Sequence, residues 1–233
     1  MSEVLEARGL KKVFHGGGDT VLEVLRHVAL AVDAGEVVAI VGASGTGKST
    51  LLHLLGALDE PTAGEILMDG HSYATLSAKQ RDEMRNRKLG FVFQFHHLLR
   101  EFSALENVMM PLLIAGSSDS QARRRAEEML QEVGLGDRMT HRPAALSGGE
   151  QQRCAVARAL VHGPRVLLAD EPSGNLDNFN SERLHDLLFG LTRTHETALV
   201  VVTHNPRLAE RADRVLLLEN GRLQPLESAE VLP

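Results

Sequence analysis

A glycine-rich segment has the residue types and spacing that bind phosphate. Residues 42–50 read GASGTGKST and fit the pattern G-x-x-x-x-G-K-S/T, with an apolar run before them and leucines after them. Glycines let backbone N–H groups converge on phosphate oxygens, and the start of the following helix adds a favourable dipole. An ordinary glycine turn is the alternative, but the flanking strand and helix favour a phosphate-binding loop. Its predicted residues are Gly42, Ala43, Ser44, Gly45, Thr46, Gly47, Lys48, Ser49 and Thr50.

Lys48 and a pair of carboxylates provide the charges that phosphoryl chemistry needs. Lys48 is suited to bridge the β- and γ-phosphates, and the Ser49 hydroxyl suits Mg²⁺, which prefers oxygen ligands. The apolar run 166–169 ends in Asp170 and Glu171. Asp170 is predicted to serve the Mg²⁺ shell through water, and Glu171 to be the general base that orients or deprotonates the attacking water. A solvated turn is the alternative for these acids.

A histidine follows another apolar run, at 198–202. In a parallel sheet the ends of such strands meet at the same edge, so His204 is expected there. Its imidazole can donate to a γ-phosphate and sense its loss. A structural or surface histidine is the alternative.

A second segment offers donors for an anion. Leu146, Ser147, Gly148, Gly149, Glu150 and Gln151 precede a helical run rich in alanine and arginine. A serine and glycines at a helix start present the donors that suit a phosphate. The chain thus has two such cradles, although only the first comes with a lysine and a carboxylate pair. We therefore predict that two copies share each ligand.

The elements that must position these residues alternate between strands and helices. Glycine turns around 16–18, 35 and 69–70 predict antiparallel hairpins. Residues 121–133 have the pattern of an amphipathic helix after a loop at 116–119. The predicted fold is α/β, with a mainly parallel sheet around the phosphate loop, an antiparallel β lobe and an inserted helical subdomain at about 95–164. Strands are expected at 4–5, 28–32, 37–41, 91–93, 166–170, 198–203 and 215–218.

Composition narrows the class of protein. The 233 residues are 43% apolar, enough for the core of one large domain. A net charge of −6 gives no global basic field, so nucleic acid is not an expected partner. The single cysteine cannot form an internal disulfide. Neither a signal peptide nor a membrane-spanning run is recognised, so membrane association is expected to come through partners.

The motifs resemble, in order, those of the ABC ATPase family along nearly the whole chain. Residues 42–50 match its Walker A loop, Gln94 its Q-loop, 146–151 its signature, 166–171 its Walker B strand, 173–177 its D-loop with Asp177, and His204 its switch histidine. The resemblance implies one ATPase domain over 1–233, with the signature in the helical subdomain. It also implies that two copies bind head to tail, each ATP lying between Walker A of one copy and the signature of the other.

The resemblance also assigns roles to residues, with some departures from the family pattern. It implies ATP hydrolysis by Glu171, His204 and Gln94, with Mg²⁺ served by Ser49, Gln94 and Asp170. Glu150 stands where many members have glutamine, and the D-loop reads SGNLD instead of SALD. Phe14 stands where an aromatic residue, commonly tyrosine, stacks on adenine. A core phenylalanine of the β lobe is the alternative.

Within the family, segments 85–99, 105–114, 141–143 and 169–177 resemble the LolD group of lipoprotein-releasing ATPases. This implies permease partners of the LolC and LolE type, a peripheral position on the cytoplasmic face of an inner membrane, and release of outer-membrane lipoproteins. A MacB-like exporter ATPase and an FtsE-like mechanotransmitting subunit of cell division are the alternatives. A partly apolar groove for a coupling helix is expected after Gln94, although several of its residues could be core: Phe95, Leu98, Leu99, Leu105 and Met109.

Overall fold

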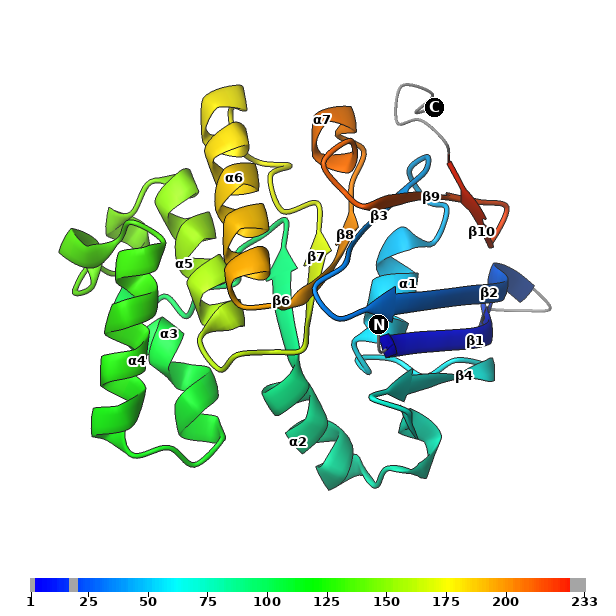
Figure 1. The fold of residues 1–233 in the computed structure, drawn as a ribbon, viewed down its shortest axis with the longest axis horizontal. Helices are drawn as coiled ribbons and strands as arrows, with labels where there is room; N and C mark the ends of the chain where they lie inside the picture. The colour runs from blue at the N-terminus through cyan, green and yellow to red at the C-terminus, as the bar shows by residue number, and fades with distance from the viewer. Residues whose placement is uncertain (1–2, 17–20, 227–233) are drawn as a thin grey trace. The chain divides into compact units, whose positions relative to one another are not determined.

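The computed structural model describes residues 3–16 and 21–226, which form two compact units (Figure 1). Unit 1 consists of Met1–Asp82 and Ala198–Pro233, and unit 2 of Glu83–Thr197. The predicted site residues are divided between the two units. The phosphate loop, Phe14 and His204 belong to unit 1, whereas Gln94, the carboxylate pair, the signature and the D-loop belong to unit 2.

One sheet of unit 1 is the predicted antiparallel lobe. Its strand order is β2-β1-β4-β5, formed by β2 (Val21–Asp33), β1 (Glu3–His15), β4 (Ala63–Met68) and β5 (His71–Ser72). The turn at 69–70 joins β4 to β5 as predicted, with positive φ at both Asp69 and Gly70, the backbone of a two-residue hairpin. Part of the turn predicted at 16–18 lies outside the described residues.

The hairpin predicted around Gly35 is wrong. The chain turns there, but β3 (Val37–Val41) joins a different sheet, between β8 (Ala198–Val202) and β9 (Arg214–Glu219) and parallel to both. All residues of β3 are buried. A strand that is apolar on both faces is typical of the centre of a parallel sheet and cannot form the half-exposed edge of the lobe. β10 (Arg222–Pro225) pairs antiparallel with β9.

Helices complete unit 1. The glycine loop leads from β3 into α1 (Lys48–Leu55), which buries Leu51, Leu52, Leu54 and Leu55. The short α7 (Pro206–Ala209) follows β8, and a 3₁₀ turn, η1 (Tyr73–Thr75), follows β5. The leucines after the loop therefore anchor the start of α1 next to the end of β3.

Unit 2 combines two parallel strands with helices. β6 (Leu89–Phe93) pairs with β7 (Val166–Asp170), and Phe93 lies level with Asp170. The helices α3 (Ala104–Ile114), α4 (Asp119–Glu132) and α5 (Gly148–Leu160) pack against one another, and α5 also packs on β6 and α6 (Asn178–Thr194) (Figure 1). The prediction of a helix at 121–133 is confirmed by α4.

Unit 2 also contains two short 3₁₀ turns, η2 (Gly136–Arg138) and η3 (Pro143–Ala145). Helix α2 (Ala78–Lys88) begins in unit 1 and ends in unit 2. A separate helical subdomain at 95–164 stays a prediction. Across residues 3–16 and 21–226, no helix is both long enough and apolar enough to cross a membrane.

The packing of α5 on β6 requires a glycine in the strand. A Cβ added at Gly90 would overlap the carbonyl oxygen of Ala159 in α5 and lie 2.9 Å from Leu167 Cδ1. We predict that Gly90→Ala lowers the free energy of unfolding by about 1–3 kcal/mol, because backbone must move. Gly190→Ala is the matched control, since a Cβ at that exposed position of α6 meets nothing within 4 Å. Urea unfolding of both variants measures the difference, and equal stabilities would contradict the packing argument.

Candidate functional site

The loop between β3 and α1 has a backbone that glycine alone adopts easily. Gly42, Gly45 and Gly47 have φ of 152°, 81° and 102°. A Cβ at Gly42 would overlap the carbonyl oxygen of Leu218, and one at Gly47 would lie 2.6 Å from Val24 Cγ1. The glycines therefore allow both the turn and its close approach to β2 and β9.

The start of α1 is uncapped. Its N-cap is Gly47, with no side-chain hydrogen bond to the first turn. By contrast, α3, α4, α5, α6 and α7 begin with serine, aspartate or asparagine side chains that accept a bond from a backbone N–H. The first N–H groups of α1 are therefore not used by a cap, which is the arrangement that suits an anionic ligand.

The lysine of this loop is held by the loop itself. Lys48 is 9% exposed, and its Nζ donates to the carbonyl oxygens of Gly42 at 2.7 Å and Ala43 at 2.9 Å. These bonds place the ammonium over the glycine turn, where it can meet phosphate oxygens that the α1 N–H groups also face. The next residue, Ser49, is exposed. The hydroxyl of Ser49 is a hard oxygen donor on the residue next to Lys48, and such a donor suits the predicted Mg²⁺.

The structure brings His204 to the same sheet edge as the glycine loop. β8 runs parallel to β3 with Val202 level with Ile40, and the N–H of Thr203 donates to the Ile40 carbonyl at 3.1 Å. His204 comes next and is exposed. Both strands therefore end at one edge of the sheet of unit 1, which confirms the expected placement of this histidine.

Phe14 lies at the far end of β1 and is not a core residue. It is 41% exposed, so the alternative of a phenylalanine in the core of the β lobe is wrong. It is level with Leu22 of β2, two residues before the Val24 side chain that approaches Gly47. The Lys12 Nζ lies 5.0 Å from the centre of the ring. One face of the ring thus meets a cation, and stacking on adenine stays a prediction.

Unit 2 places Gln94 and the carboxylate pair at one edge. Because Phe93 and Asp170 are level in β6 and β7, Gln94 and Glu171 both follow the carboxyl ends of adjacent parallel strands. Glu171 has a φ of 45°, a left-handed backbone that is uncommon for a residue with a side chain. Such conformations gather at functional sites, where the surrounding structure holds them in place.

The signature segment forms a capping box at the start of α5. Ser147 Oγ accepts from the N–H of Glu150 at 3.3 Å, and the N–H of Ser147 donates to Glu150 Oε2 at 2.8 Å. Arg138 Nε donates to the other carboxylate oxygen at 3.1 Å. The Ser147 N–H, the Ser147 hydroxyl and Arg138 together hold the pKa of Glu150 at about 2. Glu150, noted above as a departure from glutamine, therefore caps α5 as a carboxylate.

This box changes what the second cradle can offer. The Ser147 hydroxyl donates to Glu150 Oε2 at 2.9 Å, so both the hydroxyl and the N–H of this serine are occupied within the chain. The donors that remain are the N–H groups of Gly148 and Gly149 at the helix start. Gly149 is buried, and a Cβ there would lie 3.0 Å from Asn180 Oδ1. A side chain at this position would crowd the side chain of Asn180 in α6.

The D-loop contains contacts that sequence reasoning missed. Asp177 caps α6 by accepting from the N–H of Asn180 at 2.9 Å and from its Nδ2 at 2.6 Å. The Asn180 N–H, followed by its side-chain amide, lowers the pKa of Asp177. Asn175, which makes the D-loop SGNLD, exchanges two hydrogen bonds with Gln94. The asparagine in place of the usual residue was the only hint of this contact in the sequence, but it could not identify Gln94, which lies 81 residues away, as the partner.

The predicted coupling groove is only partly correct. A cavity of about 690 Å³ in unit 2 includes Phe95, which is 65% exposed, and Leu98. Leu105 and Met109 are buried in α3 and belong to the core, because the apolar face of α3 packs on α4 and α5. Leu99 is 43% exposed but does not line the cavity. The lining is completed by His96, His97, Arg100, Pro143, Ala144 and Gln151.

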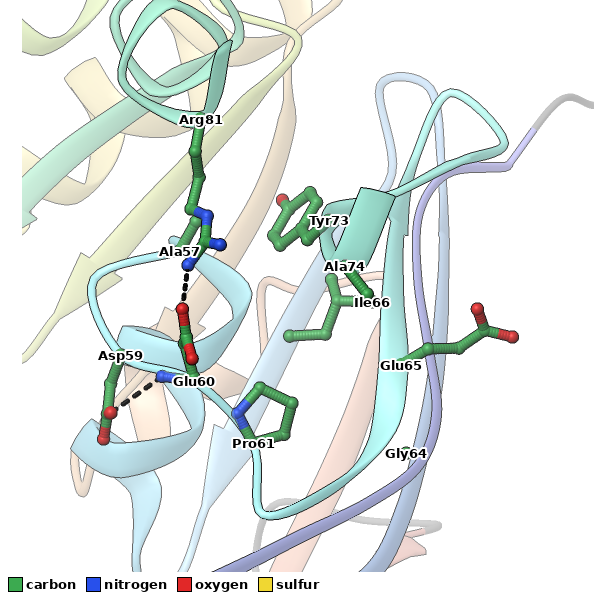
Figure 2. Close-up of a pocket in the computed structure, with 10 residues that line it drawn as sticks. All are labelled: Ala57, Asp59, Glu60, Pro61, Gly64, Glu65, Ile66, Tyr73, Ala74 and Arg81. Atoms are coloured by element: carbon green, nitrogen blue, oxygen red, sulfur yellow. Dashed lines mark hydrogen bonds and ion pairs between the residues drawn. The ribbon is translucent and has the colours of Figure 1, made fainter. Parts of the chain in front are cut away.

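Unit 1 has a further pocket, of about 270 Å³, that none of the predicted site residues lines. Figure 2 shows Arg81 reaching from the start of α2 to the carboxylate of Glu60, with Tyr73 and Ile66 to the right of them. The Tyr73 hydroxyl donates to the Leu55 carbonyl at 2.9 Å. The Tyr73 bond ties the end of α1, the helix that carries Lys48, to η1.

Comparison with known proteins agrees with this geometry. Residues 25–174 match the family model described as "ABC transporter". The chain is 54% identical over 224 residues to the lipoprotein-releasing system ATP-binding protein LolD of Legionella pneumophila (strain Lens), covering 96% of this chain and 98% of that protein. It is 55% identical over 221 residues to LolD of Bordetella pertussis, covering 95% of each.

A solved structure has the same fold. The ATP-binding cassette MJ0796, in a dimeric post-hydrolysis state bound to ADP and Pi, superposes with a TM-score of 0.88 at 36% identity, covering 97% of this chain and 98% of that one. The glycine loop, the signature and the carboxylate pair described above lie within the part of the chain matched by the family model. The chain therefore belongs to the ABC transporter family and is one of its ATP-hydrolysing subunits.

Proposed function

We propose that this chain is the ATPase subunit of a system that releases lipoproteins from a membrane. The observation that carries the proposal is the uncapped start of α1, with Lys48 beside it, in a chain more than half identical to LolD proteins over nearly its whole length. The names of these relatives favour lipoprotein release over a MacB-like exporter or an FtsE-like division protein.

Residues of unit 1 bind the triphosphate. Lys48 Nζ exchanges the carbonyls of Gly42 and Ala43 for β- and γ-phosphate oxygens, and the N–H groups at the start of α1 add further donors. His204, at the same sheet edge, donates to the γ-phosphate. Phe14 offers one ring face to the adenine, since Lys12 lies over the ring.

Residues of unit 2 carry out the hydrolytic step. Glu171 accepts a proton from the attacking water or orients it in line with the γ-phosphate. Ser49, Gln94 and Asp170 are the residues that would hold Mg²⁺, with Asp170 acting through water. Bound Mg²⁺ supplies charge that offsets the negative charge developing on the phosphates. The residues are of the types that this hard cation prefers.

We further propose that two copies act together. Each would place Ser147, Gly148 and Gly149 against the triphosphate held by the loop of the other, with Asp177 close to the contact. Two cradles in one chain support this arrangement, as does the likeness to MJ0796 cassettes that are named as dimers. Binding of ATP then closes the pair and hydrolysis releases it.

The partners are proposed to be membrane permeases of the LolC and LolE type, with the ATPase at the cytoplasmic face of an inner membrane. The cavity lined by Phe95 and Leu98 supports this, because a lining that combines apolar side chains with His96, His97 and Arg100 suits a short amphipathic helix. Arg158 of α5 donates to the carbonyls of His96 and His97 at 2.8 Å each, so the docking segment is tied to the signature helix.

Removing the base tests the catalytic assignment. We predict that Glu171→Gln lowers the ATP turnover rate by about 10²–10⁴-fold, because the amide cannot accept the proton, while ATP still binds. The variant should also accumulate as an ATP-bound dimer on gel filtration. Glu127→Gln in α4 is the control and should hydrolyse normally. Turnover of Glu171→Gln at the wild-type rate would show that another group is the base.

A capping-box pair tests the shared site. We predict that Ser147→Arg, in the Glu171→Gln background, abolishes ATP-driven dimerisation but leaves ATP binding to the monomer intact. Ser118→Arg removes the equivalent cap of α4 and should cost a similar amount of stability, about 1 kcal/mol, without affecting dimerisation. Light scattering with and without ATP measures both. Normal dimerisation of Ser147→Arg would rule out the head-to-tail arrangement.

An exposed aromatic residue tests the docking cavity. We predict that Phe95→Asp prevents co-purification with permease subunits in detergent, because a carboxylate is costly in an apolar contact. Leu58→Asp, at a 48% exposed position of unit 1, is the control and should keep the complex. ATP binding by the isolated chain should be unchanged in both. Permease binding by Phe95→Asp equal to that of the control would place the docking surface elsewhere.

A further inference from the structure

Gln94 and Asn175 form a reciprocal pair. Gln94 Nε2 donates to Asn175 Oδ1 at 3.1 Å, and Asn175 Nδ2 donates to the backbone carbonyl of Gln94 at 3.0 Å. The second bond fixes the backbone of Gln94 and the first fixes its carboxamide. Gly174 permits this close approach, since a Cβ there would lie 3.0 Å from Gln94 Nε2. One side chain of the D-loop thus holds both ends of the Q-loop glutamine.

Both sides of this pair are anchored. The carbonyl of Phe93, just before Gln94, accepts a bond at 2.9 Å from Gln152 Nε2 of α5, a side chain that is 3% exposed. On the other side, Asp177 is fixed at the start of α6 by its bonds from Asn180. Asn175 therefore lies between a fixed strand end and a fixed helix start. Its contact with Gln94 is pre-organised, so little conformational entropy is lost when the bonds form.

The pair also selects which atom Gln94 presents. A carboxamide has one oxygen and one NH₂ group, and exchanging them turns an acceptor into a donor. Because Asn175 Oδ1 takes the Nε2 group, the Oε1 atom is the one turned away from the D-loop. Only the oxygen can serve a cation or accept a hydrogen bond from water.

We propose that Asn175 is a positioning residue for the reaction, which holds Gln94 with its Oε1 directed to the Mg²⁺ and water that Gln94 is proposed to serve. The inference rests on that proposed role of Gln94. The role proposed for Asn175 involves no contact with ATP or metal, since it acts through Gln94. This role would give a reason for the asparagine in SGNLD, where the family pattern has SALD.

A double-mutant cycle tests the inference, using the full chain, MgATP and the variants Asn175→Ala, Gln94→Ala and the combination. We expect Asn175→Ala to lower kcat about three- to tenfold, the effect of one or two lost hydrogen bonds, with little change in KM for ATP. In the Gln94→Ala background the same change should have no further effect, because the group it positions is absent. Asn178→Ala, an exposed neighbour at the start of α6, is the control.

A second readout does not depend on turnover. In the Glu171→Gln background, the Mg²⁺ concentration needed for half-maximal ATP-driven dimerisation should rise about three- to tenfold with Asn175→Ala and not with Asn178→Ala. A purely structural role of Asn175 would change the unfolding temperature and leave this midpoint where it is.

The outcomes separate the inference from the function on which it rests. If Gln94→Ala leaves both kcat and the Mg²⁺ midpoint unchanged, the proposed role of Gln94 is wrong. If Gln94→Ala impairs both but Asn175→Ala impairs neither, the positioning role is wrong. It is equally wrong if the two substitutions reduce kcat independently, so that their effects multiply in the double variant.

Discussion

Every helix starts with backbone N–H groups that have no acceptor within the helix. In this chain α1 leaves these groups without a side-chain acceptor, whereas α3 to α7 provide one. In helices α3 to α7 the acceptor is a serine, aspartate or asparagine side chain. Helix α1 begins at a left-handed glycine and has no such cap. The donors that a cap would use are thereby left for phosphate, and the buried leucines of α1 stabilise a helix start that would otherwise be costly.

The two helix starts that are proposed to bind ATP differ in the same respect, since only one of them is capped by a side chain. The signature helix is capped within the chain by Ser147 and Glu150, so it can fold and persist without a ligand. The α1 loop instead uses Lys48 to satisfy its own carbonyls. This division fits the proposed shared site, in which the α1 loop of one copy would hold ATP and the signature segment of the other would only need to meet the bound nucleotide.

Local patterns were enough to predict the strands next to the chemistry. The runs 37–41 and 166–170 coincide with β3 and β7, because an uninterrupted apolar run that leads into a glycine or carboxylate motif is typical of a buried parallel strand. The hairpin prediction at Gly35 failed because a turn signal in the sequence does not show whether the next strand joins the same sheet. Helix α2 was missed because it buries no residue and so has no apolar face to detect.

The site shows the same limit. Motif order was enough to name Gln94, Glu171 and His204 as candidates, whereas the Gln94–Asn175 pair joins residues 81 positions apart through short polar side chains. Such pairs leave no periodic signal in one sequence. For the same reason Leu105 and Met109 were expected in a groove, although the packing of α3 on its neighbours buries them.

The ionised Glu150 has a consequence for what the signature helix will accept. With a pKa of about 2 the carboxylate keeps its charge at any physiological pH, and Arg138 offsets part of it. The N–H and hydroxyl of Ser147 therefore stay bonded to this carboxylate whether or not a ligand is present. In the proposed shared site, a γ-phosphate held by the neighbouring copy would meet only the N–H groups of Gly148 and Gly149, so this helix start would depend on the lysine and cation of the neighbour to compensate the phosphate charge.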